Sequence, residues 1–272
     1  MNNPVIKVEN LTKRYKGAGT PAVNNISFSV GEGEFFAFLG QNGAGKTTTI
    51  SVLTTTLAKT TGSVTIAGHD LDHEAREVRS RIGIIFQKPS LDLDLSAEEN
   101  IRLHACMYGM FGYRPFFRWM PKGYRERVTE LAGIMGIADK LHKPLKTFSG
   151  GMRRKIEIIR GLLHQPAVLF LDEPTQGLDP VSRRGLWDYI NTVRKENGTT
   201  VFLTTHYLDE AENVDKLCMV QQGEIVFFGA PAELKKSLEG ESASSPMTLE
   251  DAYVRLLTED PHDGIGARGR YP

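Results

Sequence analysis

Residues 34–48 read EFFAFLGQNGAGKTT, and this stretch decides the fold. Its first six residues are almost all apolar, which is typical of a short strand buried on both faces of a parallel sheet. The residues that follow match the pattern G-x-x-x-x-G-K-[ST], a glycine-rich loop that leads from a strand into a helix. We therefore predict an α/β protein in which this loop lies at the carboxyl end of a buried strand.

The loop has the chemistry of a phosphate-binding site. Its glycines let the chain curl so that successive backbone N–H groups point at phosphate oxygens, and the following helix adds its positive end. In this pattern Lys46 reaches the β- and γ-phosphates of a nucleotide, and the Thr47 hydroxyl is a ligand of Mg²⁺. A plain glycine turn before a helix is the alternative. The expected nucleotide-binding residues are Gly40, Gln41, Asn42, Gly43, Ala44, Gly45, Lys46, Thr47 and Thr48.

A second acidic motif follows another apolar segment. The sequence VLFLDE at 168–173 predicts a buried strand whose end delivers two adjacent carboxylates. Asp172 is placed to hold Mg²⁺ through water, and Glu173 to polarise an attacking water as general base. Taken alone, the pair is equally compatible with a strand that ends in solvent. Beside a phosphate loop, it favours nucleotide hydrolysis.

Other segments are assigned from their apolar patterns. Alternation within the first 30 residues predicts antiparallel strands. The threonine-rich segment 47–57 has the composition of a strand, but the phosphate loop must open into a helix, so we predict a helix there. Residues 96–165 are mostly helical in pattern and begin with a possible capping box, SAEE. Further strands are predicted at 62–68, 81–87, 167–172 and 200–206, a hairpin at 216–229 with its turn at Gln222-Gly223, and helices at 183–196 and 248–257, the last capped by Thr248 and Asp251.

Composition narrows the class of protein. The chain has 272 residues, 40% of them apolar, with 33 basic and 33 acidic residues and a formal net charge of +0. That balance argues against a dedicated nucleic-acid binder, which normally carries a basic excess. Its two cysteines, Cys106 and Cys218, lie far apart, which disfavours a disulfide scaffold or a zinc site and fits a reducing cytosol. We expect neither a secretory signal nor a membrane span.

Five motifs in order resemble those of one family, the ATP-binding subunits of ABC transporters. They are the phosphate loop, Gln87 after GIIF, SGG at 149–151, LFLDEPTQGLD at 169–179, and His206 after FLTT. The resemblance covers about residues 4–240. It implies a P-loop NTPase (RecA-like) core with an antiparallel β subdomain and an α-helical subdomain inserted at about 88–165. A linker and helix at 241–258 and a disordered tail at 259–272 would follow.

The resemblance also assigns roles to single residues. Tyr15 matches the aromatic residue that stacks on adenine, and Gln87 matches a glutamine that contacts Mg²⁺ and senses the membrane partner. His206 matches the histidine that contacts the γ-phosphate, and Asp179 matches an aspartate that communicates across a dimer. Packing or local hydrogen bonding is the alternative for Tyr15, Gln87 and His206.

In this family the Ser-Gly-Gly motif serves the other subunit. Ser149, Gly150 and Gly151 would cap the γ-phosphate of the nucleotide held by a partner chain, through the positive end of a helix. Two chains related by a two-fold axis would then share two ATP molecules. Phe148 and Met152 replace the commoner Leu and Gln at its flanks, while the residues that face phosphate are intact.

The segments SGGMRRK, TTHYLDEAE and TLEDAYVRLL resemble the ABC-2 exporter branch for drugs, polysaccharides and lipids. The resemblance implies an ATPase that uses ATP and Mg²⁺, pairs with a second copy of itself and drives an integral membrane permease. It would lie on the cytoplasmic face of the inner membrane as a peripheral protein, without nucleic acid. A soluble ABC-type ATPase switch without a transport partner is the alternative, and a small P-loop kinase or GTPase is a more distant one.

Residues 107–124, MYGMFGYRPFFRWMPKGY, look like an insertion relative to the family pattern. This aromatic insert interleaves basic residues with aromatic ones. Such a mixture suits a membrane headgroup region or a groove on a partner. Local core packing and stacking on nucleic acid are the alternatives. The aromatic residues are Tyr108, Phe111, Tyr113, Phe116, Phe117, Trp119 and Tyr124.

Overall fold

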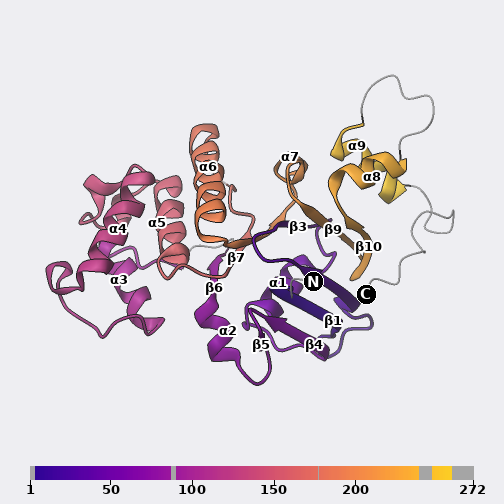
Figure 1. Ribbon diagram of the computed structural model, residues 1–272, viewed down its shortest axis with the longest axis horizontal. Coiled ribbons are helices and arrows are strands. Elements are labelled where there is room, and N and C mark those ends of the chain that lie inside the picture. Colours follow the sequence, from indigo (N-terminus) through magenta and orange to yellow (C-terminus); the bar gives the residue numbers. More distant parts are fainter. Residues whose placement is uncertain (1–3, 87–89, 177, 239–246, 259–272) are drawn as a thin grey trace. The chain divides into compact units, whose positions relative to one another are not determined.

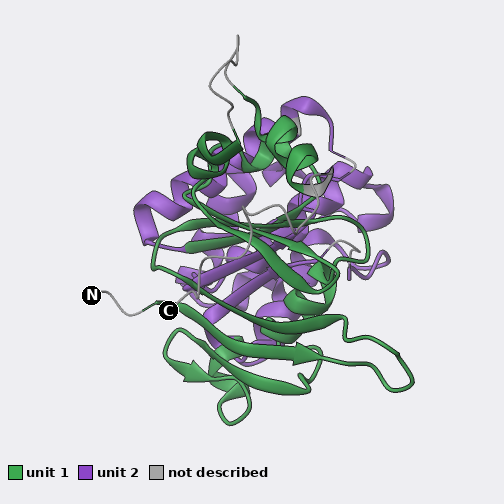
Figure 2. Ribbon diagram, turned by 90° about the vertical axis from the view of Figure 1, so that its right-hand side faces the viewer, with its two compact units in different colours: residues 1–79, 200–272 green, residues 80–199 purple. Residues whose placement is uncertain are grey.

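The computed structural model describes residues 4–86, 90–176, 178–238 and 247–258. The chain divides into two compact units. Unit 1 comprises residues 1–79 and 200–272, and unit 2 comprises residues 80–199 (Figure 2). Gln87, Gly177, the first part of the predicted linker and helix at 241–258 (to residue 246) and the predicted tail at 259–272 lie outside the described residues.

Unit 1 contains an antiparallel sheet with the strand order β2-β1-β4-β5. Figure 1 labels β1, β4 and β5. In β1, Ile6 and Val8 are buried and alternate with the exposed Lys7 and Glu9, and Ile66 of β4 is also buried. This alternation is expected of a sheet that packs one face on a core, and it confirms the predicted N-terminal antiparallel strands. The strands are β1 Ile6–Lys13, β2 Val23–Val30, β4 Thr61–Ile66 and β5 His69–Asp70.

The same unit holds the strand that carries the phosphate loop. Strand β3 pairs in parallel with β8 on one side and β9 on the other, and all its residues are buried, as predicted. Strand β10 is antiparallel to β9, and the turn at Gln222-Gly223 has φ values of 50° and 84°. Two positive φ values fit a type I′ hairpin turn. The strands are β3 Phe35–Gly40, β8 Thr200–Thr205, β9 Lys216–Gln221 and β10 Glu224–Gly229.

Helices complete unit 1. Helix α1 forms after the loop as predicted, but it ends at Leu53 rather than continuing through the threonine-rich segment. Thr248 and Asp251 cap the last helix, since the Thr248 hydroxyl donates to Asp251 at 2.6 Å and accepts its N–H at 3.1 Å. The helices are α1 Lys46–Leu53, α2 Ala75–Arg81 (which crosses into unit 2), α7 Leu208–Ala211, α8 Pro231–Leu238 and α9 Leu249–Thr258.

Unit 2 is mostly helical, with one parallel pair of strands, β6 and β7. The predicted capping box is present, because the Ser96 hydroxyl accepts the Glu99 N–H and the Glu99 carboxylate accepts the Ser96 N–H. In the described residues, no helix is both long and apolar enough to span a membrane. The elements are β6 Ile82–Ile85, α3 Ala97–Met107, α4 Lys122–Ile134, α5 Gly150–Leu162, β7 Val168–Asp172, α6 Pro180–Asn197, and 3-10 helices at Phe117–Trp119, Ala138–Lys140 and Leu145–Thr147.

Candidate functional site

The phosphate loop runs from the end of β3 to the start of α1, and its shape requires glycine at particular positions. Gly43 and Gly45 have φ values of 83° and 105°, which side chains rarely adopt. A Cβ on Gly45 would lie 2.4 Å from the Ala22 carbonyl oxygen, and one on Gly40 would lie 2.5 Å from that of Val220. The loop therefore curls only because these positions lack side chains.

The turn of the β9–β10 hairpin is hydrogen-bonded to the backbone of the phosphate loop. The Gly223 N–H donates to the Ala44 carbonyl at 3.1 Å, and the Gly223 carbonyl accepts the Asn24 N–H at 2.8 Å. The loop backbone is therefore tied to the hairpin turn, and the same glycine ties that turn to Asn24, which lies in β2. These contacts hold the loop in shape without a ligand.

Lys46 is buried in the loop. Its ammonium donates to the carbonyls of Gly40 at 2.5 Å and Gln41 at 3.1 Å. Thr47, the next residue of α1, is exposed. The charge and the hydroxyl that the motif assigns to phosphate and to Mg²⁺ thus stand together at one helix N-terminus.

Tyr15 lies beside this loop. Its hydroxyl is 3.3 Å from the Thr48 hydroxyl, and the Lys13 ammonium lies 5.4 Å from its ring centroid. Tyr15 is 45% exposed. The predicted adenine-stacking residue is therefore placed next to the phosphate loop.

His206 follows the strand next to the phosphate loop. Because β3 and β8 pair in parallel with Leu39 opposite Thr205, His206 emerges at the same sheet edge as the loop. Thr205 fixes the turn, since its hydroxyl donates to Glu210 at 2.6 Å and accepts the Tyr207 N–H at 3.0 Å. A hollow of about 380 Å³ opens here. Its lining residues are His206, Tyr207, Leu208, Asp209, Glu212, Thr248 and Glu250.

The predicted acidic pair lies in unit 2, at the end of β7. Asp172 is the last residue of the strand and is 7% exposed. Glu173 has a φ of 47°, a left-handed conformation that is uncommon for a residue other than glycine. Outliers of this kind gather at functional sites. The backbone thus turns sharply at the residue predicted to be the general base.

The Ser-Gly-Gly motif begins α5 in the same unit. The Ser149 hydroxyl accepts the Met152 N–H at 3.3 Å and so caps the helix. A Cβ on Gly150 would meet nothing within 4 Å. The helix N-terminus is therefore open around Gly150, as a site for an anion requires.

Asp179 caps the following helix, α6. Its carboxylate accepts the Val181 N–H at 3.0 Å, and its carbonyl accepts the Arg183 N–H at 2.9 Å. This capping is a structural role in addition to the role across a dimer that the family resemblance assigns. Gln87, the remaining predicted site residue, lies outside the described part of the chain.

Two buried charges on α5, Arg154 and its ion-pair partner Glu157, are missing from the predicted site, although Arg154 contacts it. Arg154 donates to the carbonyls of Asp172 and Glu173, at 3.3 Å each. The sequence feature that could have indicated them is a pair of opposite charges three residues apart, within the otherwise apolar helix face of MRRKIEII at 152–159. Sequence alone does not show what such a pair touches.

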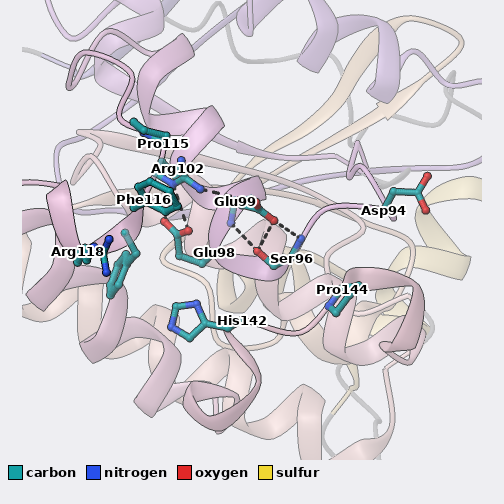
Figure 3. A pocket seen from close by; sticks show the side chains of 11 residues that line it. Asp94, Ser96, Glu98, Glu99, Arg102, Pro115, Phe116, Arg118, His142 and Pro144 are labelled. Carbon is teal, nitrogen blue, oxygen red and sulfur yellow. Dashed lines mark hydrogen bonds and ion pairs between the residues drawn. The ribbon is translucent and has the colours of Figure 1, made fainter.

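The aromatic insert lies next to a larger hollow in unit 2, of about 600 Å³ (Figure 3). Arg102 donates to Glu98 at 2.9 Å and to the Arg114 carbonyl at 2.5 Å, so the insert is attached to α3. The lining residues are Asp94, Ser96, Glu98, Glu99, Arg102, Pro115, Phe116, Phe117, Arg118, His142 and Pro144.

The side chains of the insert divide into two groups. Tyr124 is 2% exposed and makes edge-to-face contacts with Phe111 and Phe117. Phe116 and Trp119 are 50% and 49% exposed, and they pack on each other with centroids 4.8 Å apart. One group therefore forms local core, and the other faces solvent.

Mg²⁺ would have to be held by few protein ligands. Among the described residues, no three His, Cys, Asp or Glu side chains are grouped as a metal site. Mg²⁺ in nucleotide sites normally keeps several waters and takes its other ligands from phosphates and one or two protein oxygens. Thr47 at the start of α1 and Asp172 at the end of β7 each carry an oxygen of the kind that Mg²⁺ takes.

Comparison with known proteins gives consistent results. The sequence matches a family model described as ABC transporter over residues 23–176. The daunorubicin/doxorubicin resistance ATP-binding protein DrrA of Streptomyces peucetius is 40% identical, over 93% of this chain and 73% of DrrA. The probable multidrug ABC transporter ATP-binding protein YbhF of Escherichia coli K12 is 33% identical over 93% of this chain, which spans only 42% of the length of YbhF.

A solved structure matches as well. It is a dimer of the ATP-binding cassette MJ0796 in a post-hydrolysis state with ADP and Pi, at a TM-score of 0.72 and 26% identity. The match covers 83% of this chain and 98% of that chain. The predicted P-loop NTPase fold is confirmed.

Proposed function

Because this chain belongs to the ABC transporter family, we propose that it hydrolyses ATP to drive a separate membrane permease that exports its substrate. The carrying observation is the phosphate loop, which is already curled and holds the Lys46 ammonium on its own carbonyls at 2.5 and 3.1 Å. A curled glycine-rich loop at a helix N-terminus, with a lysine ammonium in it, is an arrangement that suits the binding of phosphates.

Within that function each motif residue has a distinct task. Lys46 binds the β- and γ-phosphates, Tyr15 stacks on adenine, and His206 contacts the γ-phosphate. Glu173 takes the proton of the attacking water as general base. Thr47, Asp172 and Gln87 would hold Mg²⁺, which neutralises charge that develops on the phosphates.

We further propose that two copies of this chain form the working unit. Ser149, Gly150 and Gly151 of one copy would cap the γ-phosphate bound by the other, and Asp179 would communicate between the copies. The open space around Gly150 supports this arrangement, because an incoming phosphate needs a helix N-terminus that no side chain covers. The related MJ0796 cassette is a dimer in its solved structure.

The permease is expected to meet the helical part of the chain, which we place at about 88–165. The hollow beside the aromatic insert and the exposed Phe116 and Trp119 support this proposal, since exposed aromatics are typical anchors of protein interfaces. The chain would then be a peripheral protein on the cytoplasmic face of the inner membrane. Export is supported by the names of DrrA and YbhF, which refer to drug resistance and multidrug transport.

Steady-state ATPase assays of the purified chain, with and without Mg²⁺, test the central proposal. We expect release of phosphate that requires Mg²⁺ and that disappears in Lys46→Ala, which removes the charge on the phosphates. Lys7→Ala, which removes an exposed lysine of β1 that pairs with Glu9 at 2.8 Å, is the matched control and should remain active. A wild-type chain that binds no ATP, or equal rates in wild type and Lys46→Ala, would refute the assignment.

A further inference from the structure

Helix α5 carries a buried ion pair that lies outside the nucleotide motifs. Arg154 and Glu157 are 5% and 6% exposed, and their side chains meet at 3.0 Å. Buried charges of this kind are uncommon, and well-packed apolar residues often replace such a pair without loss of stability. The other contacts of the pair therefore indicate what it does.

Arg154 holds the turn that follows β7. Its guanidinium donates to three consecutive carbonyls, those of Asp172 at 3.3 Å, Glu173 at 3.3 Å and Pro174 at 3.0 Å. At the centre of this turn Glu173 has its left-handed φ of 47°. A strained backbone persists only where its surroundings fix it, and a planar guanidinium that engages three carbonyls is such a constraint.

The same pair holds a second backbone segment. Arg154 donates to the carbonyl of Phe86, and Glu157 accepts the Ser90 N–H at 3.1 Å. Arg160, on the same helix, donates to the Ser90 carbonyl at 2.8 Å. One helix therefore fixes the turn at Glu173 and two residues that follow β6.

We propose that Arg154 is a positioning residue that fixes the direction of the Glu173 carboxylate. This inference rests on the proposed function, in which Glu173 is the general base. Arg154 lies within two turns of Ser149 on α5, so the helix that caps a partner's nucleotide also sets the base for the nucleotide of its own chain. Lysine cannot replace arginine here, because an ammonium has no planar set of donors to span three carbonyls.

The test uses the full chain with Arg154→Lys and with a matched control, Arg153→Lys. Arg153 is adjacent, but its Nε donates to the Leu145 carbonyl at 3.2 Å, away from the turn at Glu173. We expect Arg154→Lys to lower kcat by about 10- to 100-fold, the effect of misplacing a catalytic group. The KM for ATP and the affinity for a fluorescent ATP analogue should stay near wild type. Arg153→Lys should match wild type in all three.

A double-mutant cycle separates positioning from a structural role. Rates are divided by the folded fraction measured by circular dichroism. In the Glu173→Gln background, Arg154→Lys should cause no further loss, because no base remains to be positioned. A purely structural role would lower the rate equally in both backgrounds. Glu157→Gln, which keeps the size of the side chain but removes the charge that holds the Arg154 guanidinium, is the second variant in case Arg154→Lys folds poorly, and it should show the same coupling to Glu173.

The possible results distinguish a failure of the positioning role from a failure of the proposed ATPase function. A wild-type chain without ATPase activity overturns both. An active wild type overturns the positioning role alone in two cases. The first is that Arg154→Lys and Glu157→Gln keep the wild-type kcat per folded molecule. The second is that their losses persist undiminished in Glu173→Gln.

Discussion

Glu173 is the general base in the proposed function. We expect Glu173→Gln to keep the affinity for ATP and to lower turnover by roughly 10²- to 10⁴-fold, the contribution of a positioned general base. The amide has nearly the same shape, so the turn at φ 47° is preserved. The variant should also accumulate as an ATP-bound dimer. Steady-state ATPase assays and size-exclusion chromatography with ATP check both results, and near-normal turnover would remove Glu173 from the role of base.

His104 makes stability depend on pH. Its burial, followed by the nearby Arg160 charge and His164, lowers the pKa of His104 to about 3. The unfolded chain binds this proton below about pH 6.5. Between those values the unfolded state carries more protons, so stability falls as pH falls, by at most about 1.4 kcal/mol per unit.

The variant His104→Gln isolates this contribution. Glutamine keeps an acceptor for the Arg160 guanidinium, which donates to His104 Nδ1 at 3.1 Å, and it does not titrate. Urea unfolding at pH 7.0 and 5.5 should show a smaller loss of stability on acidification than in wild type. His142→Gln, at a histidine outside this buried cluster, is the control. Equal losses in His104→Gln and wild type would contradict the effect of burial.

Residues of the phosphate loop could be predicted because a local pattern determines their geometry. Lys46 begins α1, and the Tyr15 hydroxyl lies 3.3 Å from that of Thr48, while their roles toward a nucleotide stay predictions. Arg154 could not be predicted, since its partners Phe86 and Pro174 are far away in sequence. A contact between distant segments leaves no local trace except an unusual charge on an apolar face.

Helix α1 shows how local chemistry and the loop compete. The loop sets the start of the helix, and the predicted helix forms despite its threonines. Its end depends on the Thr54 hydroxyl, which donates to the Ile50 carbonyl at 2.7 Å, and on Thr55, whose φ is 61°. Side chains that bond to nearby carbonyls compete with helix continuation. The low helix propensity of the threonines therefore did not prevent the helix from starting, but it contributed to where the helix ends.

The aromatic insert allows two variants with opposite expectations. Replacing the exposed pair, Phe116→Ser with Trp119→Ser, should change the free energy of unfolding by less than about 1 kcal/mol and weaken binding to the permease. Replacing the inner ring, Phe117→Ala, should cost about 2–3 kcal/mol, because a half-buried phenylalanine loses part of its packing. Urea unfolding and co-purification with the membrane subunit distinguish them. A destabilised exposed-pair variant that still binds its partner would reject the interface.

At the scale of the two compact units, the sequence predicts the individual elements better than it predicts the boundaries of the units. The strand and helix segments followed from apolar periodicity, and the β3, β7 and β8 strands are as predicted; the order of strands in the sheets was not predicted. The proposed subdomain at 88–165 remains a prediction, while unit 2 is described from 80 to 199. The periodicity of the sequence shows which residues are buried, but it does not show which segments pack together. The boundaries of compact units are therefore the feature that it predicts least well.

Pairing of two chains can be tested by complementation. Lys46→Ala disables the phosphate loop, and Gly150→Asp places a carboxylate against the γ-phosphate. Each homodimer should be inactive. If Ser149-Gly150-Gly151 serves the partner's nucleotide, mixed dimers contain one site with both lesions and one intact site. Random pairing then leaves roughly a quarter of all sites whole, and ATPase activity should return on mixing.

The control for this experiment is cross-linking that shows mixed dimers. The open space around Gly150 favours folding of the aspartate variant, which melting curves check. Mixed dimers without any recovery of ATPase activity would show that each chain completes its own site.

The hydrogen bond between Gly223 and the phosphate loop means that a residue far from the loop in sequence can affect the loop that we expect to bind the nucleotide. Gly223 bonds to Ala44, and a Cβ on Gly223 would lie 3.0 Å from the Ala22 carbonyl oxygen. The same carbonyl limits Gly45. A single methyl group in the hairpin turn would therefore push on the loop through Ala22. A substitution in the hairpin can therefore change the shape of the phosphate loop while every residue of the loop itself stays the same.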